Sequence, residues 1–210
     1  MNASPLPPVI TSVAGSVIAR TAPLSDRAAH DASEALGQQW FGPSFDESRF
    51  DAWAERIVHL LFVAEDTHSG AFLGYADQLF LTPATEQALR DGTITEDAFD
   101  EHSVLDDAEL LRLPAGSRVA LYLAGMCVTA PGTTAGREAA MALRACRRTL
   151  VAAWRAQGLE IVLLMAAATE AGRRVATGAG GLLVSPAAAR ADGYDLFELT
   201  DIPDERARRS

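Results

Sequence analysis

One stretch, from Arg118 to Gly158, constrains the fold of this chain more than any other. It begins with an apolar run, RVALYLAGMCV, that predicts a long buried strand. A loop of Pro, Gly and Thr follows, and then a helical pattern from about Thr134 to Gln157 that Gly158 closes. A strand of this length that leads directly into a long helix belongs in a sheet covered by helices.

The loop within this stretch, in VTAPGTTAGREAAMAL, is compatible with two structures. Backbone N–H groups at a helix start are unpaired and lie at the positive end of the helix dipole, so they can bind an anion such as a phosphate. An ordinary strand-to-helix connection explains the same residues equally well. A nucleotide P-loop is excluded, because no Lys-Ser/Thr pair follows Gly136.

The rest of the chain alternates between strand-like and helical patterns. We predict strands over 9–20, 60–66, 71–81, 161–165, 182–184 and 194–199, and helices over 26–36, from Phe50 to Leu60 or Leu61, and over 168–177. Thr67–Gly70 predicts a hairpin turn between two of the strands. The acidic segment 82–114 is expected to be a helical insertion in one domain spanning 9–200, with flexible ends at 1–8 and 201–210.

Composition restricts the possible partners. The net charge is −10, and all 18 basic residues are arginine. This charge argues against nonspecific nucleic-acid or membrane-surface binding, although a local basic face is compatible with it. Cys127 and Cys146 form neither a disulfide framework nor a metal-ligand pattern, and the apolar N-terminal stretch lacks the basic residues of a secretory signal. We therefore expect a cytoplasmic protein with reduced thiols and no metal.

Four segments carry a resemblance to a known superfamily. They are VIARTAPLSDRAAHDA (17–32), FVAEDTHSGAFLGYA (62–76), GMCVTAPGTTAGREAAMAL (125–143) and IVLLMAAATEAGRRVATGAGGLLV (161–184). In this order they resemble the GCN5-related N-acetyltransferases (GNAT), which transfer acyl groups from coenzyme A thioesters. The resemblance implies an α/β (α+β) fold of order β-α-α-β-β-(insert)-β-α-β-α-β-β, with a mixed, mostly antiparallel sheet and helices on both faces.

The resemblance also implies an acyl-CoA site, with acetyl-CoA or another acyl-CoA as donor. The implied cofactor-binding residues are Met126, Cys127, Val128, Thr133, Thr134, Ala135, Gly136, Arg137, Glu138 and Ala139. The family's pyrophosphate loop, Arg/Gln-x-x-Gly-x-Gly/Ala, is degenerate here, since Thr134 replaces the basic or amide residue and Arg137 replaces the middle glycine. Arg137 either obstructs the phosphates or supplies charge to them, and both alternatives stay open.

The residue that protonates the leaving thiolate is also unusual. Many members of the family place a Tyr in the helix after the fifth strand, where this chain has Val175 or Ala176. Tyr122, Tyr75 and Glu170 are the catalytic candidates that replace it, and Asp77 is a further residue that can face the cleft. The alternative for either Tyr is a buried ring with a satisfied hydroxyl, and for Glu170 the stabilisation of a helix N-terminus. Strict alternation along the strand predicts that Tyr122 and Ala124 share one face and Gly125 and Cys127 the other.

Two further expectations concern the 118–158 stretch. The resemblance implies that its strand is distorted near Gly125 and diverges from the strand at 161–165. In the family, the pantetheine arm of the donor binds between these two strands. Arg137, Arg144, Arg148 and Arg155 form one stripe along the helix, and we expect a solvated arginine face for all but Arg137. Cys127, in an apolar strand, is expected to be inert core and not an acyl carrier.

The resemblance thus implies an acyl-CoA-dependent acyltransferase that transfers an acetyl group to an amine by direct attack in a ternary complex. The alternative is a catalytically inactive protein of the same fold that binds a ligand or partner. The acceptor is expected to be a small-molecule or peptide amine, since the 82–114 segment beside it is acidic. The resemblance adds the expectation of a homodimer through the C-terminal strands.

Overall fold

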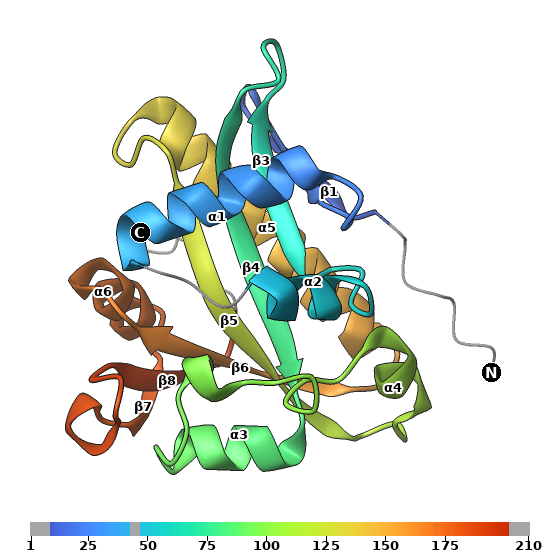
Figure 1. Cartoon of the computed structure of the whole chain (residues 1–210), viewed down its shortest axis with the longest axis vertical. Coiled ribbons are helices and arrows are strands. Elements are labelled where there is room, and N and C mark those ends of the chain that lie inside the picture. Colours follow the sequence, from blue (N-terminus) through green and yellow to red (C-terminus); the bar gives the residue numbers. More distant parts are fainter. Residues whose placement is uncertain (1–8, 43–46, 202–210) are drawn as a thin grey trace.

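A single eight-stranded sheet organises the molecule, in the order β1-β2-β3-β4-β5-β6-β8-β7 (Figure 1). The computed structural model describes residues 9–42 and 47–201. Neighbouring strands are antiparallel except for the central pair β5 and β6, which is parallel. The predicted mixed, mostly antiparallel sheet with helices on both faces is confirmed.

The strands are β1 (Thr11–Ala14), β2 (Val17–Thr21), β3 (Leu61–Asp66), β4 (Phe72–Leu81), β5 (Arg118–Val128), β6 (Glu160–Ala167), β7 (Leu182–Ser185) and β8 (Asp195–Leu199). The helices are α1 (Arg27–Phe41), α2 (Glu47–Ala54), α3 (Pro83–Arg90), α4 (Asp107–Arg112), α5 (Thr134–Ala156) and α6 (Glu170–Gly178). Two 3₁₀ turns, η1 (Glu96–Ala98) and η2 (Ala187–Ala189), complete the elements. Within the described residues no helix is long and apolar enough to cross a membrane.

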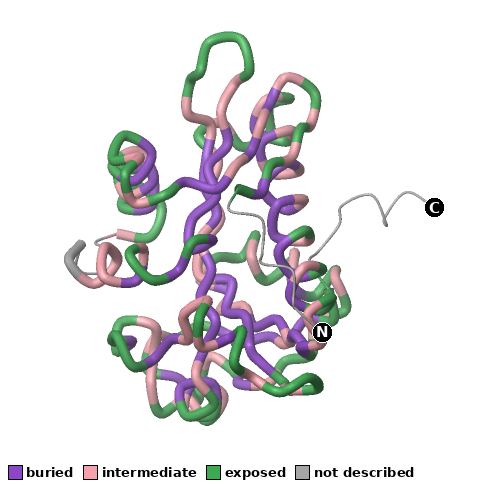
Figure 2. The backbone as a smooth tube through the Cα atoms, turned by 90° about the vertical axis from the view of Figure 1, so that its right-hand side faces the viewer, coloured by how far each residue is buried: buried purple, intermediate pink, exposed green. Residues whose placement is uncertain are grey.

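The two faces of the sheet bury separate apolar cores. On one face, α5 inserts Leu143, Cys146 and Trp154 against the strands, and α6 adds Ala176. On the other face, α1, α2 and α3 with the η1 turn cover the sheet (Figure 1), whereas Leu110 of α4 packs into the α5-side core. The strands between them are buried along most of their length, while the connecting loops are exposed (Figure 2). Each large side chain removed from water in this way stabilises the fold by about 1.5–3 kcal/mol.

Two predicted elements differ from the structure. The predicted strand at 9–20 is a hairpin, because Gly15 adopts a φ of 59° and turns the chain between β1 and β2. The predicted second helix is too long, since α2 ends at Ala54 and Ile57 and Leu60 lie in turns before β3. Their helical spacing arises because Trp53, Ile57 and Leu60 enter one core from consecutive turns. The Gly70 hairpin, with a φ of 70°, is confirmed.

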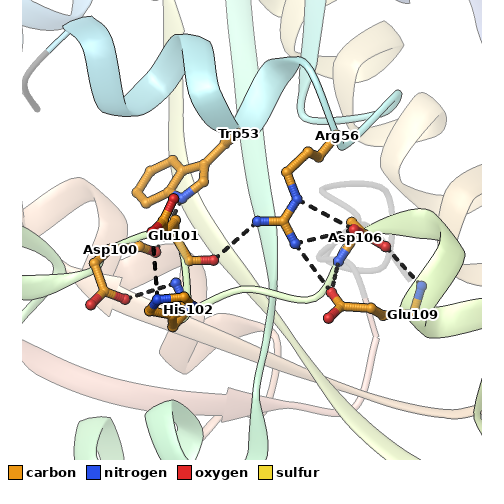
Figure 3. Close-up of polar contacts among 7 residues, drawn as sticks. All are labelled: Trp53, Arg56, Asp100, Glu101, His102, Asp106 and Glu109. Carbon is orange, nitrogen blue, oxygen red and sulfur yellow. Dashed lines mark hydrogen bonds and ion pairs between the residues drawn. The ribbon is translucent and has the colours of Figure 1, made fainter.

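The 82–114 segment is tied to the end of α2 by polar contacts (Figure 3). The indole N–H of Trp53 donates to the carbonyl of Asp100 at 3.2 Å. The Arg56 guanidinium donates to the Asp106 carboxylate at 3.1 Å and to the carbonyl of Glu101 at 3.2 Å. Asp106 in turn caps α4 in a capping box with Glu109. These contacts fix the segment, and the η1 turn within it, over the sheet.

A β-bulge interrupts the pairing of β4 and β5. Asp77 lies opposite Gly125 and Leu79 lies opposite Tyr122, so β5 has two residues between these pairs where β4 has one. The predicted distortion of this strand is therefore present, three residues after Tyr122. Because the extra residue reverses the alternation, Tyr122 and Gly125 lie on the same face, and the predicted assignment of the two to opposite faces is wrong.

Candidate functional site

The central parallel pair of strands opens into a fork. β5 and β6 are paired only from Arg118 and Glu160 as far as Tyr122 and Leu164. Beyond that point β5 continues to Val128 beside β4, and β6 continues to Ala167 beside β8. The facing edges of the two strands therefore carry backbone groups without a strand partner, as the resemblance implied.

Two cavities meet at this fork, one on each face of the sheet. The first, the α1-side cavity, has a volume of about 390 Å³ and lies beneath α1 and the η1 turn. The second, the α5-side cavity, has a volume of about 240 Å³ and lies beside α5 and α6. Both are lined by Phe41, Ala124, Gly125, Ala166 and Ala168. A molecule held in one cavity can therefore reach a molecule in the other through the fork.

A hydrogen-bonded Tyr–Glu pair lies in the α1-side cavity. The Tyr122 hydroxyl donates to the Glu96 carboxylate at 2.6 Å, and the Phe99 ring packs edge-on against Tyr122 at 5.7 Å. Burial raises the pKa of Glu96 to about 8, although the Tyr122 hydroxyl opposes the rise. Near neutral pH this carboxyl group therefore exchanges a proton readily, as a general base must.

Asp77 is a second buried carboxylate in this cavity. It lies opposite Gly125 at the bulge, and among the described residues its Oδ1 has no hydrogen-bond partner. Burial raises the pKa of Asp77, while the nearby Arg147 guanidinium acts against the rise. A buried oxygen without a hydrogen-bond partner lowers the stability of the fold. Such an oxygen is therefore a candidate to bind a ligand or a water molecule.

Arg147, on α5, holds the bulge from the opposite face. Its guanidinium donates to the side-chain oxygen of Gln78 at 3.0 Å, to the carbonyl of Asp77 at 2.6 Å and to the carbonyl of Gly125. Arg147 is 4% exposed, and burial lowers its pKa to about 10. It remains a cation at neutral pH and satisfies carbonyls that the bulge removes from the β4–β5 ladder.

The structure brings two of the three catalytic candidates together. Tyr75 and Tyr122 both line the α1-side cavity and are 6% and 1% exposed. Glu170 lies elsewhere, with a side chain that is 66% exposed and ion-paired to Arg174 at 3.1 Å. It lines neither cavity, so we do not retain it as a catalytic candidate. Val175, at the position where the family often has a Tyr, lines the α5-side cavity.

Cys127 lies on the α1 side of the sheet, packed with Tyr75 and Leu36. It is 7% exposed, and burial raises the pKa of its thiol to about 11. A thiol with this pKa is protonated at neutral pH and is a poor nucleophile, in agreement with the expected inert role. Met126, its neighbour, faces the opposite way and lines the α5-side cavity. Val128 pairs with Gly74 in β4 and packs into the α5-side core.

The loop before α5 presents a helix N-terminus. Thr133 is the N-cap, and its hydroxyl accepts from the N–H of Gly136 at 3.1 Å. Among the described residues, the N–H groups of Thr134 and Ala135 have no hydrogen-bond acceptor. A Cβ at position 136 would collide with the carbonyl oxygen of Ala130, so glycine is required for the helix to start against the end of β5.

The remaining predicted loop residues behave differently from one another. The Arg137 guanidinium lies across the loop and donates to the carbonyl of Gly132 at 2.6 Å and to the Thr134 hydroxyl at 3.2 Å. Glu138 is directed away from the loop, because its carboxylate accepts from the N–H and the hydroxyl of Ser16 at 3.0 and 3.1 Å. Ala139 is fully buried in the core. Of these three side chains, only that of Arg137 lies at the helix start.

The arginine stripe of α5 is not a uniformly solvated face. Arg144 is 7% exposed and lines the α5-side cavity with Arg147. Arg155 donates to the carbonyl of Ile161 at 3.1 Å and so joins α5 to β6. The expected solvated role is therefore wrong for Arg144, because the stripe faces the fork and not the solvent at this level.

Glu96 and Arg147 are the two site residues that the sequence did not indicate. Glu96 is one acid among many in the 82–114 segment, and Arg147 lies outside the predicted stripe. The apolar residue Phe99, three positions after Glu96, is the signal for the turn that directs the carboxylate inward, since it is fully buried. Among the described residues, no group of His, Cys, Asp or Glu side chains is placed to hold a metal ion.

Solved structures share this architecture. Ard1 from Thermoplasma volcanium matches over 88% of this chain and 96% of its own, with a TM-score of 0.52 and 8% sequence identity. A chain of the NatC complex bound to Gag peptide and CoA matches over 90% of this chain and 99% of its own, with a TM-score of 0.52 and 11% identity. No family model and no curated protein matches the sequence.

These likenesses show that the chain shares the mixed α/β fold of the two structures. This is the fold that the resemblance to the GNAT N-acetyltransferases implied.

Proposed function

We propose that this protein transfers an acyl group, most simply acetyl, from a coenzyme A thioester to an amine by direct attack within a ternary complex. The observation that carries the proposal is the fork between β5 and β6, which joins a cavity on each face of the sheet. A donor and an acceptor that occupy different cavities meet at Ala124, Gly125 and Ala166. The CoA named with NatC is consistent with such a donor.

The donor occupies the α5-side cavity in this proposal. Its pantetheine arm lies along the edge of β5 beyond Tyr122, where backbone groups without a strand partner hydrogen-bond its amides. Its diphosphate lies at the start of α5, where the N–H groups of Thr134 and Ala135 and the Arg137 guanidinium supply positive charge. Glu138 and Ala139 contribute no side-chain contact.

The acceptor occupies the α1-side cavity. Four acidic residues line it, namely Asp77, Glu96, Asp97 and Asp192. Of these, Asp192 accepts two hydrogen bonds from the Arg190 guanidinium. Such a surface attracts a cationic amine and disfavours an anionic acceptor. The acidic 82–114 segment thus has a role in the choice of acceptor, because it supplies Glu96 and Asp97.

Glu96 and Tyr122 manage the protons. The neutral amine attacks the thioester carbon, so that an N–C bond forms and the C–S bond breaks. The ionised Glu96 carboxylate accepts the proton that the amine nitrogen loses. The departing sulfur takes a proton from the Tyr122 hydroxyl. Glu96 then returns a proton to Tyr122. The amine loses one proton and the CoA sulfur gains one, so the two residues finish in their initial states.

Calorimetric titration with acetyl-CoA, followed by an assay of thiol release with a panel of amines, tests this function. Binding at micromolar concentration and amine-dependent thiol release are expected. Absence of acetyl-CoA binding at high micromolar concentration would remove the donor and overturn the proposal. Binding of CoA without turnover on any amine would instead show an inactive binding protein of the same fold.

A further inference from the structure

A third cavity, beneath α1, extends the acceptor site in a direction that the acyl transfer itself does not use. This His30 cavity has a volume of about 80 Å³, and His30, Asp77, Tyr75, Ser33 and Glu34 are among the residues that line it. Gly37, Tyr75 and Asp77 line the α1-side cavity as well. One molecule can therefore extend from the fork into the His30 cavity.

Two buried polar side chains in this cavity lack partners. His30 is 8% exposed, and among the described residues neither of its ring nitrogens has a hydrogen-bond partner. The same holds for Oδ1 of Asp77. The His30 ring is fixed by edge-on packing against Phe50 at 5.7 Å, so its position is set by the apolar neighbours and not by its nitrogens. Buried nitrogen and oxygen atoms of this kind are stabilised when a ligand satisfies them.

The charges around the cavity identify the chemistry of that ligand. Four carboxylates line it, those of Asp31, Glu34, Asp51 and Asp77. Among the described residues that line the cavity, Arg27 alone carries a guanidinium, and it donates to both carboxylate oxygens of Asp51 at 2.8 Å. An ammonium group supplies N–H donors to a carboxylate oxygen and to an imidazole lone pair, and it is about the size of a water molecule, whose share of liquid volume is roughly 30 Å³. A cavity of about 80 Å³ accommodates it with an adjoining methylene.

We propose that the amine acceptor carries a second cationic group, and that the His30 cavity binds this group through Asp77 Oδ1 and a ring nitrogen of His30. The acceptor class is thus an alkanediamine, or another amine with an ammonium group a few carbons from the reacting nitrogen. The inference depends on the proposed acyl transfer for the reacting end of the acceptor. The binding of the second ammonium is measurable without it.

The test compares diamines with monoamines of equal carbon number. Diamines of three to six carbons and the matching monoamines, such as 1,4-diaminobutane and butylamine, are titrated by calorimetry and assayed with acetyl-CoA. We expect tighter binding and about tenfold higher kcat/KM for the best diamine, carried mainly by KM, with a clear optimum in chain length. Equal values for diamines and monoamines would overturn the inference but leave the acyltransferase intact.

Variants of His30 locate the effect. His30→Phe keeps a ring against Phe50 but removes both nitrogens, so the preference for the diamine should fall by about tenfold. His30→Gln keeps a hydrogen-bonding group and should retain part of the preference. His102→Ala, at a ring that is 85% exposed, is the matched control and should retain all of it. An unchanged preference in His30→Phe would contradict the proposal.

Two further outcomes separate this inference from its alternatives. A crystal soaked in 1,4-diaminobutane is expected to show the diamine end in the His30 cavity, and ordered water alone there would overturn the proposal. Failure of every amine to bind would also overturn it, whereas absence of acetyl-CoA binding would overturn the acyltransferase function separately. If His30→Phe does not fold, the comparison of diamine with monoamine in the unaltered protein decides the question.

Discussion

Tyr122 and Glu96 form a 2.6 Å hydrogen bond although they come from a central strand and from a 3₁₀ turn in the acidic segment. The bond joins the floor of the α1-side cavity to its cover. Contacts from Trp53 and Arg56 hold that segment in place, so the pairing is built into the fold (Figure 3). Three of the five predictions below concern this pair, and the other two concern arginines of α5.

Replacement of Glu96 by Gln should reduce kcat by about 100-fold, because the amide cannot accept the proton of the attacking amine. With the pKa of Glu96 at about 8, kcat/KM of the unaltered protein should rise with pH up to about 8 and then level off. Steady-state kinetics from pH 6 to 9.5 measures both effects. Glu101→Gln, in the same segment but outside the cavity, is the control. A full rate in Glu96→Gln would remove this residue from the mechanism.

Replacement of Tyr122 by Phe should move the acidic limb of the pH profile. The Tyr122 hydroxyl lowers the pKa of Glu96, so its removal raises that pKa further and shifts the limb to higher pH. The rate at pH 7 should fall, while the rate well above pH 8 recovers in part. Tyr194→Phe, in the lining of the same cavity, should leave the position of the limb unchanged. A limb that moves to lower pH would contradict the assignment.

Glu96 should also make stability depend on pH. Its pKa is about 8 in the folded state and about 4.5 in the unfolded chain, so the folded protein binds an additional proton between these pH values. The contribution of the protonated Glu96 carboxyl group to the free energy of unfolding is fully present below about pH 4.5 and is lost as the pH rises through 8. Thermal melts across this range should therefore show a fall in Tm that Glu96→Gln lacks. Identical pH dependence in both proteins would show that the carboxyl group is not protonated in the fold.

Replacement of Arg137 by Ala should weaken coenzyme A binding by about tenfold, since a cation is removed beside the N–H groups of Thr134 and Ala135. Calorimetry at two salt concentrations is the measurement, and the variant should show less salt dependence. Arg174→Ala, at an exposed site on α6, is the control. Tighter binding in Arg137→Ala would show that the guanidinium, which lies across the loop, obstructs the diphosphate.

Replacement of Arg147 by Met should lower the free energy of unfolding by about 3 kcal/mol or more. The change leaves the carbonyls of Asp77 and Gly125 without their buried donor and Asp77 without its nearby cation. Urea unfolding measures it, with Arg174→Ala as a surface control expected to change stability by less than about 0.5 kcal/mol. If the two variants prove equally stable, Arg147 does not support the bulge.

Much of the fold could be predicted from sequence because it depends on local patterns. The apolar run of β5, the start of the first helix near Asp26 and the Gly70 turn are each encoded by a few adjacent residues, and each is present. The sequence does not reveal the β1–β2 hairpin, because β-branched residues recur on both sides of Gly15 and only this glycine marks the turn. Helix ends were less accurate, as α2 shows, because Ile57 and Leu60 continue the apolar spacing after the helix has ended.

The candidate site was predicted less well, since it depends on pairing across the sheet. One additional residue in β5 reverses the alternation of its side chains. No local pattern predicts where between Leu123 and Gly125 the bulge occurs. Glu96 acquires its role from the burial of Phe99 and from contacts with α2, which lie far away in the sequence. Tyr75 and Tyr122 were identified because they are rare polar groups in apolar strands, and such groups are recognisable without the fold.

The fork has a consequence for how such a protein can change over time. None of the residues of the α5-side cavity comes from 82–114, whereas Thr95, Glu96 and Asp97 of that segment line the α1-side cavity. In the proposed function, substitutions in this segment change which amine is accepted but leave the residues that bind the thioester unaltered. Selectivity and donor recognition are therefore separable traits in this architecture, and exchange of one surface segment is a direct route to new acceptors.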